Sequence, residues 1–355
     1  MDFGRLPSLA GVSFDLPPLP ERSRRMLAFH SGARDPDSAA LWLRTGAPAW
    51  ARKDWLGKMY PLGTPDREFL RLYARRVDSI ELNASYYRVP SEEVLDGWAS
   101  EVPDRFRFCP KVHQSITHRR ALEESARDGF DFAVRMLRLG RLLGPGFLQL
   151  PPWLDAGGLR GLDELLAALP EAFRVAVEFR HPSWFHRGAL REDAVRVLEQ
   201  RGAGAVITDV AGRRDVCHAA ITAPFVIVRF VGNGYADRGL HPTDLPRADV
   251  WLRRLVEWRA LGLGEAYFFA HEPDDALAPE LLTHVAQTAR AEGLDVPAID
   301  LAAAAIDLAA PPAGQGTPHH ESPPAAASTA QLDLFGAAPA AAAKGPRRAA
   351  NRTKK

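Results

Sequence analysis

The sequence predicts an α/β protein built as a TIM-like (β/α)8 barrel, with an irregular N-terminal lead-in and a disordered C-terminal tail. Eight short apolar stretches read as strands, and helical patterns follow seven of them. Such alternation is typical of parallel strands joined by helical crossovers. Eight units in about 250 residues match the size of a barrel. A doubly wound open sheet is the alternative, but neither a Gly-x-Gly-x-x-Gly motif after the first strand nor a Walker-type phosphate loop is present.

The first half of the barrel follows a lead-in of residues 1–38 that is rich in proline. Its helices are indicated by one-sided apolar spacing, by a capping serine at Ser91 and by a Gly-Pro stop at residues 144–145. In chain order, the predicted strands are Leu41–Arg44, Asp78–Leu82, Phe106–Cys109 and Phe147–Leu150. The predicted helices are Asp66–Arg76, Ser91–Glu101 and Gly129–Leu143.

The second half repeats this rhythm and completes a domain predicted to span residues 39–295. Its weak link is Asp209–Pro224, which joins the sixth and seventh strands without a clear helical pattern. The predicted strands are Arg174–Phe179, Ala205–Thr208, Phe225–Val231 and Ala266–Ala270. The predicted helices are Leu159–Leu169, Leu190–Arg201, Ala248–Leu261 and Pro279–Ala291.

Composition favours an ordinary soluble protein. The apolar fraction is 46%, the charged fraction is 25% and the net charge is only +1, so any positive field must be local. Cys109 and Cys217 have neither metal-finger nor disulfide-framework spacing, and Cys109 is expected to be a small buried apolar residue. No membrane-length apolar stretch and no secretion signal are recognised, so we expect a cytoplasmic protein without membrane contact.

Polar side chains gather where the predicted strands end. In a barrel the catalytic face is built from these carboxyl ends and the loops after them, and an inert mouth need not collect so many desolvated polar groups. We assign catalytic roles to Glu81, Lys111, His118, Glu178 and Asp209. We assign substrate binding to Asn83, Tyr87, Arg88, Gln149, Arg180, His181, Trp184, Arg229, Asn233 and His271. The alternative for each is a structural one, such as an ion pair of Glu178 or Arg180.

Several segments together resemble the YecE-like family, a domain of unknown function. They are Trp55–Pro61, Ile80–Asn83, Tyr86–Pro90, Phe106–Lys111, Ile116–His118, Leu148–Pro152 and Val177–Trp184. The resemblance covers about residues 41–290. It implies a TIM-like barrel distantly similar to the xylose-isomerase and apurinic-endonuclease barrels, without an established reaction. Many relatives end the eighth strand with Phe-Asn-Asn, whereas this chain reads Phe-Phe-Ala-His-Glu at residues 268–272, so any eighth-strand role stays in doubt.

Three chemistries fit the mouth. An anion-binding pocket is favoured, because Lys111, Arg180 and Arg229 suit a phosphate or carboxylate ligand. Acid/base hydrolysis comes second, with Glu178 as base and His118 or Lys111 as acid. A divalent metal comes third: carboxylates and imidazoles are present, but the same cations oppose metal binding and no His-x-His spacing occurs.

The tail of residues 296–355 carries a short apolar peptide in an Ala- and Pro-rich background. Such a background cannot bury enough surface to order itself. The peptide is Gln331, Leu332, Asp333, Leu334 and Phe335, and it resembles the bacterial sliding-clamp binding motif, Gln-Leu-(Ser or Asp)-Leu-Phe. The resemblance implies that the glutamine bonds at the rim of a clamp pocket while the last leucine and the phenylalanine fill it. The alternatives are an incidental apolar stretch or a helix folded back on the barrel.

The chain closes, over residues 344–355, with six cations and no acid. Such an end attracts nucleic-acid phosphates, or simply keeps the chain soluble. We therefore predict an enzyme, of the phosphodiester or glycosidic hydrolase type, that acts on a phosphate-containing or nucleic-acid substrate and is recruited to DNA by the sliding clamp. The alternatives are a non-catalytic nucleic-acid or nucleotide adaptor, and a small-molecule carbohydrate or nucleotide enzyme with an incidental tail.

Overall fold

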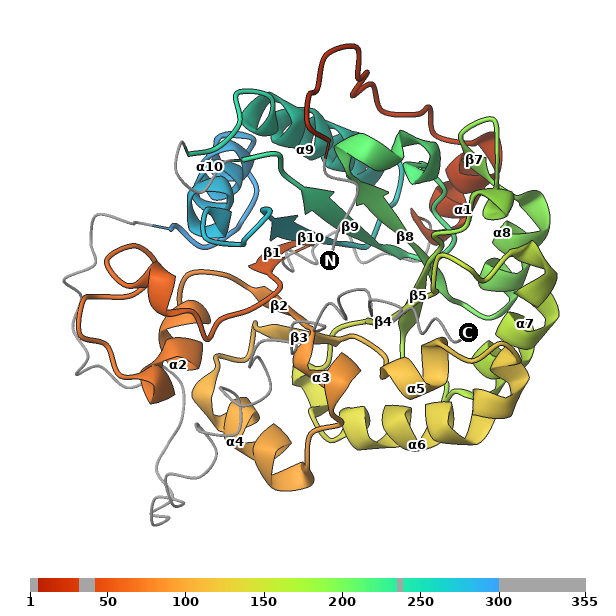
Figure 1. The fold of residues 1–355 in the computed structure, drawn as a ribbon, viewed down its shortest axis with the longest axis horizontal. Helices are drawn as coiled ribbons and strands as arrows, with labels where there is room; N and C mark the ends of the chain where they lie inside the picture. The colour runs from red at the N-terminus through yellow and green to blue at the C-terminus, as the bar shows by residue number, and fades with distance from the viewer. Residues whose placement is uncertain (1–5, 32–41, 235–238, 300–355) are drawn as a thin grey trace, which may run out of the picture.

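A barrel of eight parallel strands forms the centre of the computed structural model, which describes residues 6–31, 42–234 and 239–299 (Figure 1). Around the barrel the strands lie in the order β3-β2-β1-β10-β9-β8-β5-β4. Bridges from Phe108 to Leu143 and from Lys111 to Phe147 join β3 to β4 and close it. The predicted fold class is confirmed. The strands are β1 Leu43–Ala47, β2 Ser79–Leu82, β3 Arg107–Pro110, β4 Gly146–Gln149, β5 Val175–Glu178, β8 Gly204–Asp209, β9 Phe225–Val231 and β10 Glu265–His271.

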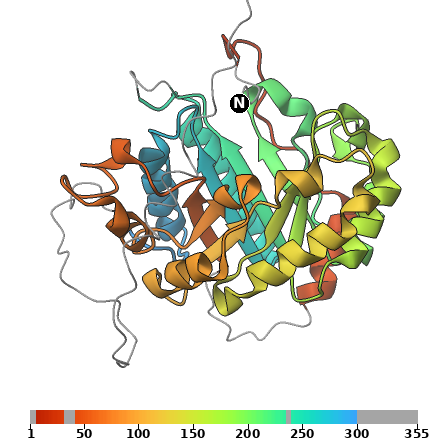
Figure 2. The same cartoon turned by 60° about the horizontal axis from the view of Figure 1, so that its bottom comes forward.

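Helices surround the barrel (Figures 1 and 2). They are α1 Glu21–Ser31, α2 Phe69–Tyr73, α3 Ala84–Tyr87, α4 Glu92–Glu101, α5 Gln114–Thr117, α6 Ala126–Leu137, α7 Leu159–Ala168, α8 Glu192–Gln200, α9 Asp244–Ala260 and α10 Ala278–Ala291. A small hairpin of β6 Phe185–His186 and β7 Ala189–Leu190 follows β5. Ser91 caps α4 as predicted, because its hydroxyl accepts a bond from the Val94 amide.

Two helix predictions were too long. The helix expected over residues 66–76 is a 3-10 turn, Asp66–Glu68, followed by the short α2. The helix expected to run to Leu143 ends at Leu137, and a separate 3-10 turn covers Gly140–Leu142. Gly140 has a φ of +52° there, a left-handed conformation that a continuing α-helix does not contain.

The lead-in is not irregular throughout, because residues 21–31 form α1. Between β8 and β9 the described chain has only the 3-10 turn Ala211–Val216, so this crossover lacks the α-helix found after the other strands. Helix α1 packs at this place: the Ser23 hydroxyl accepts a 2.9 Å bond from the Ile221 amide, and Arg22 pairs with Glu192 and Glu199 of α8. Figure 1 shows α1 beside α8. The N-terminal segment thus supplies the outer-ring helix that the weak sixth link omits.

The barrel interior has an apolar layer below a charged one. Cys109, Phe147, Ala176, Ile227 and Phe269 belong to a buried cluster. Because side chains alternate along a strand, the next inward positions lie two residues further on, toward the carboxyl ends. Those positions hold Lys111, Gln149, Glu178, Arg229 and His271. The predicted burial of Cys109 is confirmed, and its thiol is free.

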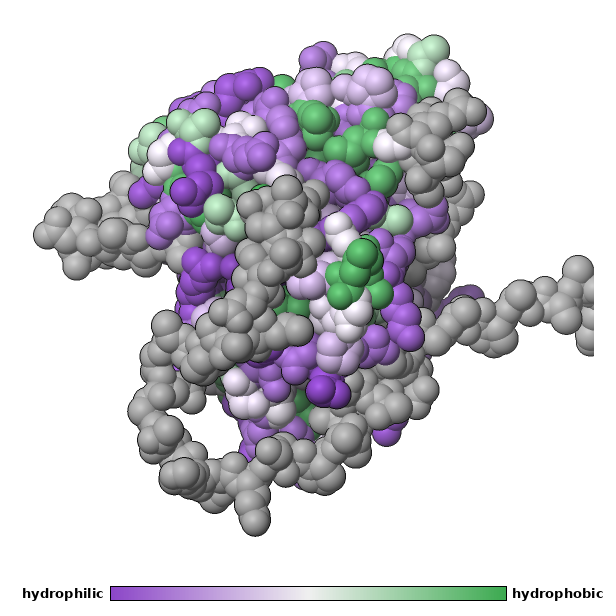
Figure 3. Space-filling view, turned by 90° about the vertical axis from the view of Figure 1, so that its left-hand side faces the viewer, coloured by the Kyte–Doolittle hydropathy of each residue, from purple (hydrophilic) through white to green (hydrophobic). Residues whose placement is uncertain are grey.

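No helix in the described ranges combines the length and apolar character needed to cross a bilayer. On the face drawn in Figure 3 the coloured surface is mainly hydrophilic and is interrupted by small hydrophobic patches. Isolated exposed apolar residues, such as Leu62, are ordinary on a folded protein.

The role of α1 can be tested with two substitutions in the same helix. Leu27 is fully buried, whereas the side chain of Phe29 is 80% exposed. We expect Leu27→Ala to lower the free energy of unfolding by about 2–4 kcal/mol, since it removes buried methyl groups and leaves a cavity. Phe29→Ala is the control and should change it by less than about 0.5 kcal/mol. Urea denaturation measures both; equal effects would show that α1 is not part of the core.

Candidate functional site

A buried cluster of charges at the barrel mouth is centred on Arg229 of β9. Its Nε and Nη2 donate to the two carboxylate oxygens of Glu81 at 2.9 and 3.0 Å, and its Nη1 donates to Glu178 at 2.8 Å. Arg229 therefore joins carboxylates from β2 and β5 across the interior. All three side chains are at most 4% exposed.

Other polar groups hold the two carboxylates from the sides. Glu178 also accepts bonds from Gln149 at 3.0 Å and from the Nε of Arg180 at 2.8 Å. The imidazole of His271 lies 2.9 Å from Glu81, which also accepts a bond from Asn83. These residues come from β2, β4, β5, β9 and β10 or the turns after them. Besides Glu178 and Arg229, five predicted site residues therefore meet in this cluster: Glu81, Asn83, Gln149, Arg180 and His271.

The cluster keeps both carboxylates ionised. Burial alone raises the pKa of Glu178, but the charges of Arg229 and Arg180 and the Gln149 hydrogen bond outweigh it and lower the pKa to about 2. For Glu81, burial is likewise outweighed, and Arg229 and His271 hold its pKa well below the usual value. Both carboxylates therefore act as fixed negative charges at neutral pH.

Lys111 stands apart from these ion pairs. Its side chain follows β3 and is 3% exposed, and its ammonium lies 4.2 Å from the ring centroid of Tyr86. Burial, followed by the positive charge of Arg229, lowers the pKa of Lys111 to about 7. The Tyr86 hydroxyl lies 3.2 Å from Nε2 of His118, and burial lowers the pKa of that imidazole. An amine that exchanges a proton near neutral pH is thus placed beside a Tyr–His pair.

The cluster opens into a cavity of about 850 Å³, a volume that suits a small metabolite. Lys111 and Arg229 lie at the inner part of its wall, with Asn83, Tyr87 and His271. Loops after β1, β2, β9 and β10 complete the wall. Its remaining charged lining residues are Arg52, Lys53, Asp54, Glu272, Asp274 and Asp275.

Glu272 is a cavity residue to which the sequence analysis assigned no role. It occupies a slot beside Gly232 and Gly234, where a Cβ on Gly232 would come within 2.1 Å of its Oε1. The Gly234 amide donates to Oε2 at 3.1 Å, whereas the buried Oε1 has no hydrogen-bond partner among the described residues. Burial and the negative charge of Asp244 raise the pKa of Glu272 to about 8. It is therefore a mainly neutral acid at pH 7, able to donate a proton.

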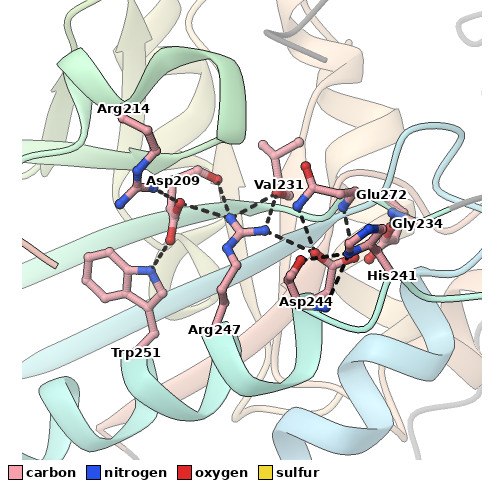
Figure 4. A network of polar contacts seen from close by, with 11 residues as sticks. Asp209, Arg214, Val231, Gly234, His241, Asp244, Arg247, Trp251 and Glu272 are labelled. Atoms are coloured by element: carbon pink, nitrogen blue, oxygen red, sulfur yellow. Dashed lines mark hydrogen bonds and ion pairs between the residues drawn. The ribbon is translucent and has the colours of Figure 1, made fainter. Parts of the chain in front are cut away.

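Asp209 lies outside the central cluster, in the network drawn in Figure 4. It accepts bonds from Arg247 at 2.9 Å and from the Trp251 indole at 2.6 Å, and it pairs with Arg214. Asn233 joins the same network by donating twice to Asp244. These contacts tie helix α9 to the ends of β8 and β9. A positioning role accounts for both residues, and the catalytic role predicted for Asp209 stays untested.

Three other predicted residues also lie away from the cluster. Trp184 is fully buried and its indole donates to the Leu154 carbonyl, which gives it a packing role. His181 accepts a bond from the Ser183 amide at the start of a 3-10 turn. Arg88 is exposed. The sequence placed all three at a strand end, but it does not show which way each points.

The donor set does not suit a divalent metal. Arg229 occupies the space between Glu81 and Glu178 and bonds to both. Within the described ranges no three His, Cys, Asp or Glu side chains converge as metal ligands would. A resident metal would have to displace a buried guanidinium, so no step is derived through one.

Fold and site together define a (β/α)8 barrel with a charged cavity at the carboxyl ends of its strands. The chain belongs to the family described as "Protein of unknown function DUF72", whose model matches residues 44–304. It is 33% identical over 255 residues to the UPF0759 protein YecE of Escherichia coli K12, covering 67% of this chain and 89% of that one. It is 28% identical over 151 residues to the UPF0759 protein YunF of Bacillus subtilis, covering 39% of this chain and 51% of that one.

Solved structures show the same fold. A DUF72 family protein from Thermotoga maritima matches with a TM-score of 0.56 at 21% identity, covering 71% of this chain and 99% of that one. Another from Enterococcus faecalis gives 0.57 at 17% identity, covering 70% and 95%. The resemblance to the YecE-like family is thereby confirmed. The clamp-type peptide, residues 331–335, lies outside the described residues.

Removing Arg229 should leave two buried carboxylates without their shared partner. We expect Arg229→Met to lower the free energy of unfolding by about 3–5 kcal/mol at pH 7. The control is Arg138→Met: Arg138 also bridges two acids, Glu92 and Asp96, but on the surface, and its loss should leave stability nearly unchanged. Urea denaturation at pH 7 compares the variants. Similar losses of stability would show that the buried bridge contributes no more than the exposed one.

The pH dependence of the same variant gives a second prediction. In the wild type the folded pKa of Glu178 lies near 2, below its ordinary value of 4.5. Its stabilising contribution is therefore complete above pH 4.5 and is lost as the pH falls toward 2. Without Arg229, burial raises the folded pKa of the carboxyls instead, so the penalty shrinks as they take up protons. Denaturation at pH 7 and pH 4.5 should show a smaller deficit at the lower pH; a constant deficit would contradict this account.

Proposed function

We propose that the chain is an enzyme that acts on a phosphate-bearing substrate held in the mouth cavity, and that residues 331–335 recruit it to the sliding clamp. The observation that carries the first part is Lys111. It is a buried cation on the cavity wall that makes no ion pair with a carboxylate in the described part of the chain. A desolvated cation in that state gains most from an anionic ligand.

The charge balance around Lys111 supports an anion. Glu81 and Glu178 carry two negative charges, which Arg229 and Arg180 together balance. Glu272, with its pKa near 8, contributes little negative charge at pH 7. The inner cavity is therefore positive whenever Lys111 is protonated, and a phosphate oxygen would take the place of a missing carboxylate.

The acid and base roles follow from the same pKa values. A carboxylate with a pKa near 2 is a weak base at neutral pH, so Glu178 is better suited to fixing Arg229 than to abstracting protons. Lys111, with a pKa near 7, is well matched to proton transfer. Glu272 supplies a neutral acid on the same wall. Strongly displaced pKa values cluster at catalytic sites, so the two such groups that line this cavity, Lys111 and Glu272, support an enzyme over a simple binding module.

Anion binding can be tested with sulfate, whose charge is constant across neutral pH. Lys111 attracts sulfate only when it is protonated. The affinity for sulfate should therefore fall as the pH rises through 7, approaching about tenfold per pH unit. Lys111→Met should bind weakly at every pH. Lys58→Met is the control, since Lys58 pairs with Glu280 outside the cavity. Isothermal titration calorimetry measures the affinities; equal binding by wild type and Lys111→Met below pH 7 would reject the proposal.

Recruitment rests on the sequence alone. All five positions of residues 331–335 fit the clamp-binding pattern, and the basic residues at 344–355 supply cations that attract DNA phosphates nearby. A barrel acting on a nucleic-acid end or lesion would gain access to newly copied DNA by this route. The two parts of the proposal are independent, because the cavity lies in the barrel and the peptide in the tail.

The clamp interaction is tested by pull-down with purified bacterial sliding clamp. Leu334→Ala and Phe335→Ala should each weaken binding by about 2 kcal/mol or more, roughly thirtyfold, as anchor residues do. Leu308→Ala is the matched control, because Leu308 is a leucine of the same tail outside the peptide. Unchanged retention of the double variant would refute recruitment while leaving the cavity proposal intact.

A further inference from the structure

We infer that Lys111 is a nucleophile that forms an imine with a carbonyl carbon of its substrate, so that the cavity takes a phosphate-bearing aldehyde or ketone such as an open-chain sugar phosphate. The inference rests on the proposed function, since it names the substrate class of the same cavity. The inference goes beyond the proposed function because it replaces simple anion binding and proton transfer with a covalent step.

Lysine is rare in this chain, and its placement here is selective. Only six of the 45 Lys and Arg residues are lysines. Three of them, Lys53, Lys58 and Lys111, lie in the described ranges, and only Lys111 is buried there. The other buried Lys or Arg residues of the described ranges are arginines, such as Arg229 and Arg247. Arginine does not lose its proton in proteins, whereas a buried lysine does so readily. A cation needed only for its charge could be an arginine here too, so the choice of lysine at position 111 indicates a role that needs a neutral amine.

The surroundings of Lys111 favour its neutral form. Both nearby carboxylates bond to Arg229, so the described contacts of the amine are the faces of two aromatic rings, Tyr86 at 4.2 Å and Phe147 at 6.0 Å. A ring face attracts an ammonium, but less strongly than a carboxylate does. Burial and the charge of Arg229 lower the pKa of the amine despite these contacts. A lysine becomes a nucleophile under these conditions, when it is desolvated or lies next to another cation. A structural lysine would instead be expected to take one of the carboxylates.

The covalent step balances without an added reagent. The lone pair of the neutral Nζ attacks the carbonyl carbon while the C=O π pair moves to the oxygen, and one proton passes from nitrogen to that oxygen to give a carbinolamine. Nitrogen then forms the C=N bond as the C–O bond breaks, and the second amine proton passes to the departing hydroxyl, which leaves as water. Amine and carbonyl thus give imine and water. His118 and Tyr86, 3.2 Å apart beside the amine, are placed to pass the protons.

Cavity size and contents fit such a substrate. The volume of about 850 Å³ holds a sugar phosphate with room for water, and Lys111 opens directly onto it. Polar side chains that suit hydroxyl groups, Asn83 and Tyr87, lie on the same wall. The deoxyribose aldehyde of an abasic nucleotide has the same chemistry as a free sugar phosphate, a carbonyl within one small unit of a phosphate. The two sources therefore form separate arms of one experiment.

The experiment traps the imine with sodium cyanoborohydride, which reduces C=N to a stable amine. The full-length protein is incubated near pH 7 with ribose 5-phosphate in one arm and with an oligonucleotide containing an abasic site in the other, and the adduct is located by peptide mass mapping. We expect one adduct, on Lys111, in at least one arm. It should be lost to background in Lys111→Met and retained in Lys58→Met.

The outcomes separate this inference from the proposed function. Adduct with ribose 5-phosphate alone supports a small sugar phosphate, and adduct with the oligonucleotide supports a nucleic-acid lesion. No adduct on Lys111 in either arm, or adducts only on the other five lysines, overturns the inference. If sulfate binding still depends on Lys111 in the same preparation, the anion site stands without the imine. If that dependence is also absent, both fail. Peptide mapping of the wild type decides the matter even where a variant does not fold.

Discussion

The bridge that Arg229 makes between Glu81 and Glu178 determines the chemistry of the barrel mouth. One guanidinium on β9 satisfies carboxylates on β2 and β5, so the negative charges of the mouth are used in pairing. Lys111 is left without a carboxylate as a consequence. Were Glu81 or Glu178 free to pair with Lys111, the amine would keep its proton far above neutral pH. A buried bridge of this kind adds little stability over an apolar core, so its value lies in the arrangement it fixes.

The barrel itself was predictable because its signals are local. Strand Phe225–Val231 was predicted with the bounds it has, since a strongly apolar run between proline and glycine permits little else. Helix α1 was not predicted. Few of its residues are apolar, as the sequence Glu-Arg-Ser-Arg-Arg-Met-Leu-Ala-Phe-His-Ser shows. Leu27 is buried because it packs into the groove that is left where the sixth crossover has no α-helix. That groove is a tertiary feature: its contact with α1 through Ile221 and Ser23 joins residues 198 positions apart, and no pattern within α1 encodes it.

The sequence predicts where the site lies, but not which of its residues contact one another. The carboxyl ends of parallel strands meet at one rim, which places Glu81, Lys111, Glu178 and Arg229 correctly. Asp209 has the same sequence signature, yet Trp251 and Arg247 of α9 bind its carboxylate in a separate network. Glu272 shows the converse: the slot beside Gly232 and Gly234 buries this carboxyl, and burial together with the charge of Asp244 raises its pKa to about 8. Which partner reaches a strand-end residue depends on contacts distant in sequence, and one sequence does not reveal them.

The displaced pKa values support the proposal of an enzyme over that of a binding module. Glu178 belongs to the charge cluster at the barrel mouth and Glu272 lines the cavity, and their environments move the two pKa values apart, to about 2 and about 8, while the pKa of Lys111 falls to about 7. A site that only holds an anion needs fixed positive charge, which arginine supplies without titrating. A site that transfers protons needs a permanent charge, a neutral acid and a neutral base together near pH 7. Arg229 provides the first, Glu272 the second and Lys111 the third, which is the combination that the proposed enzyme would need.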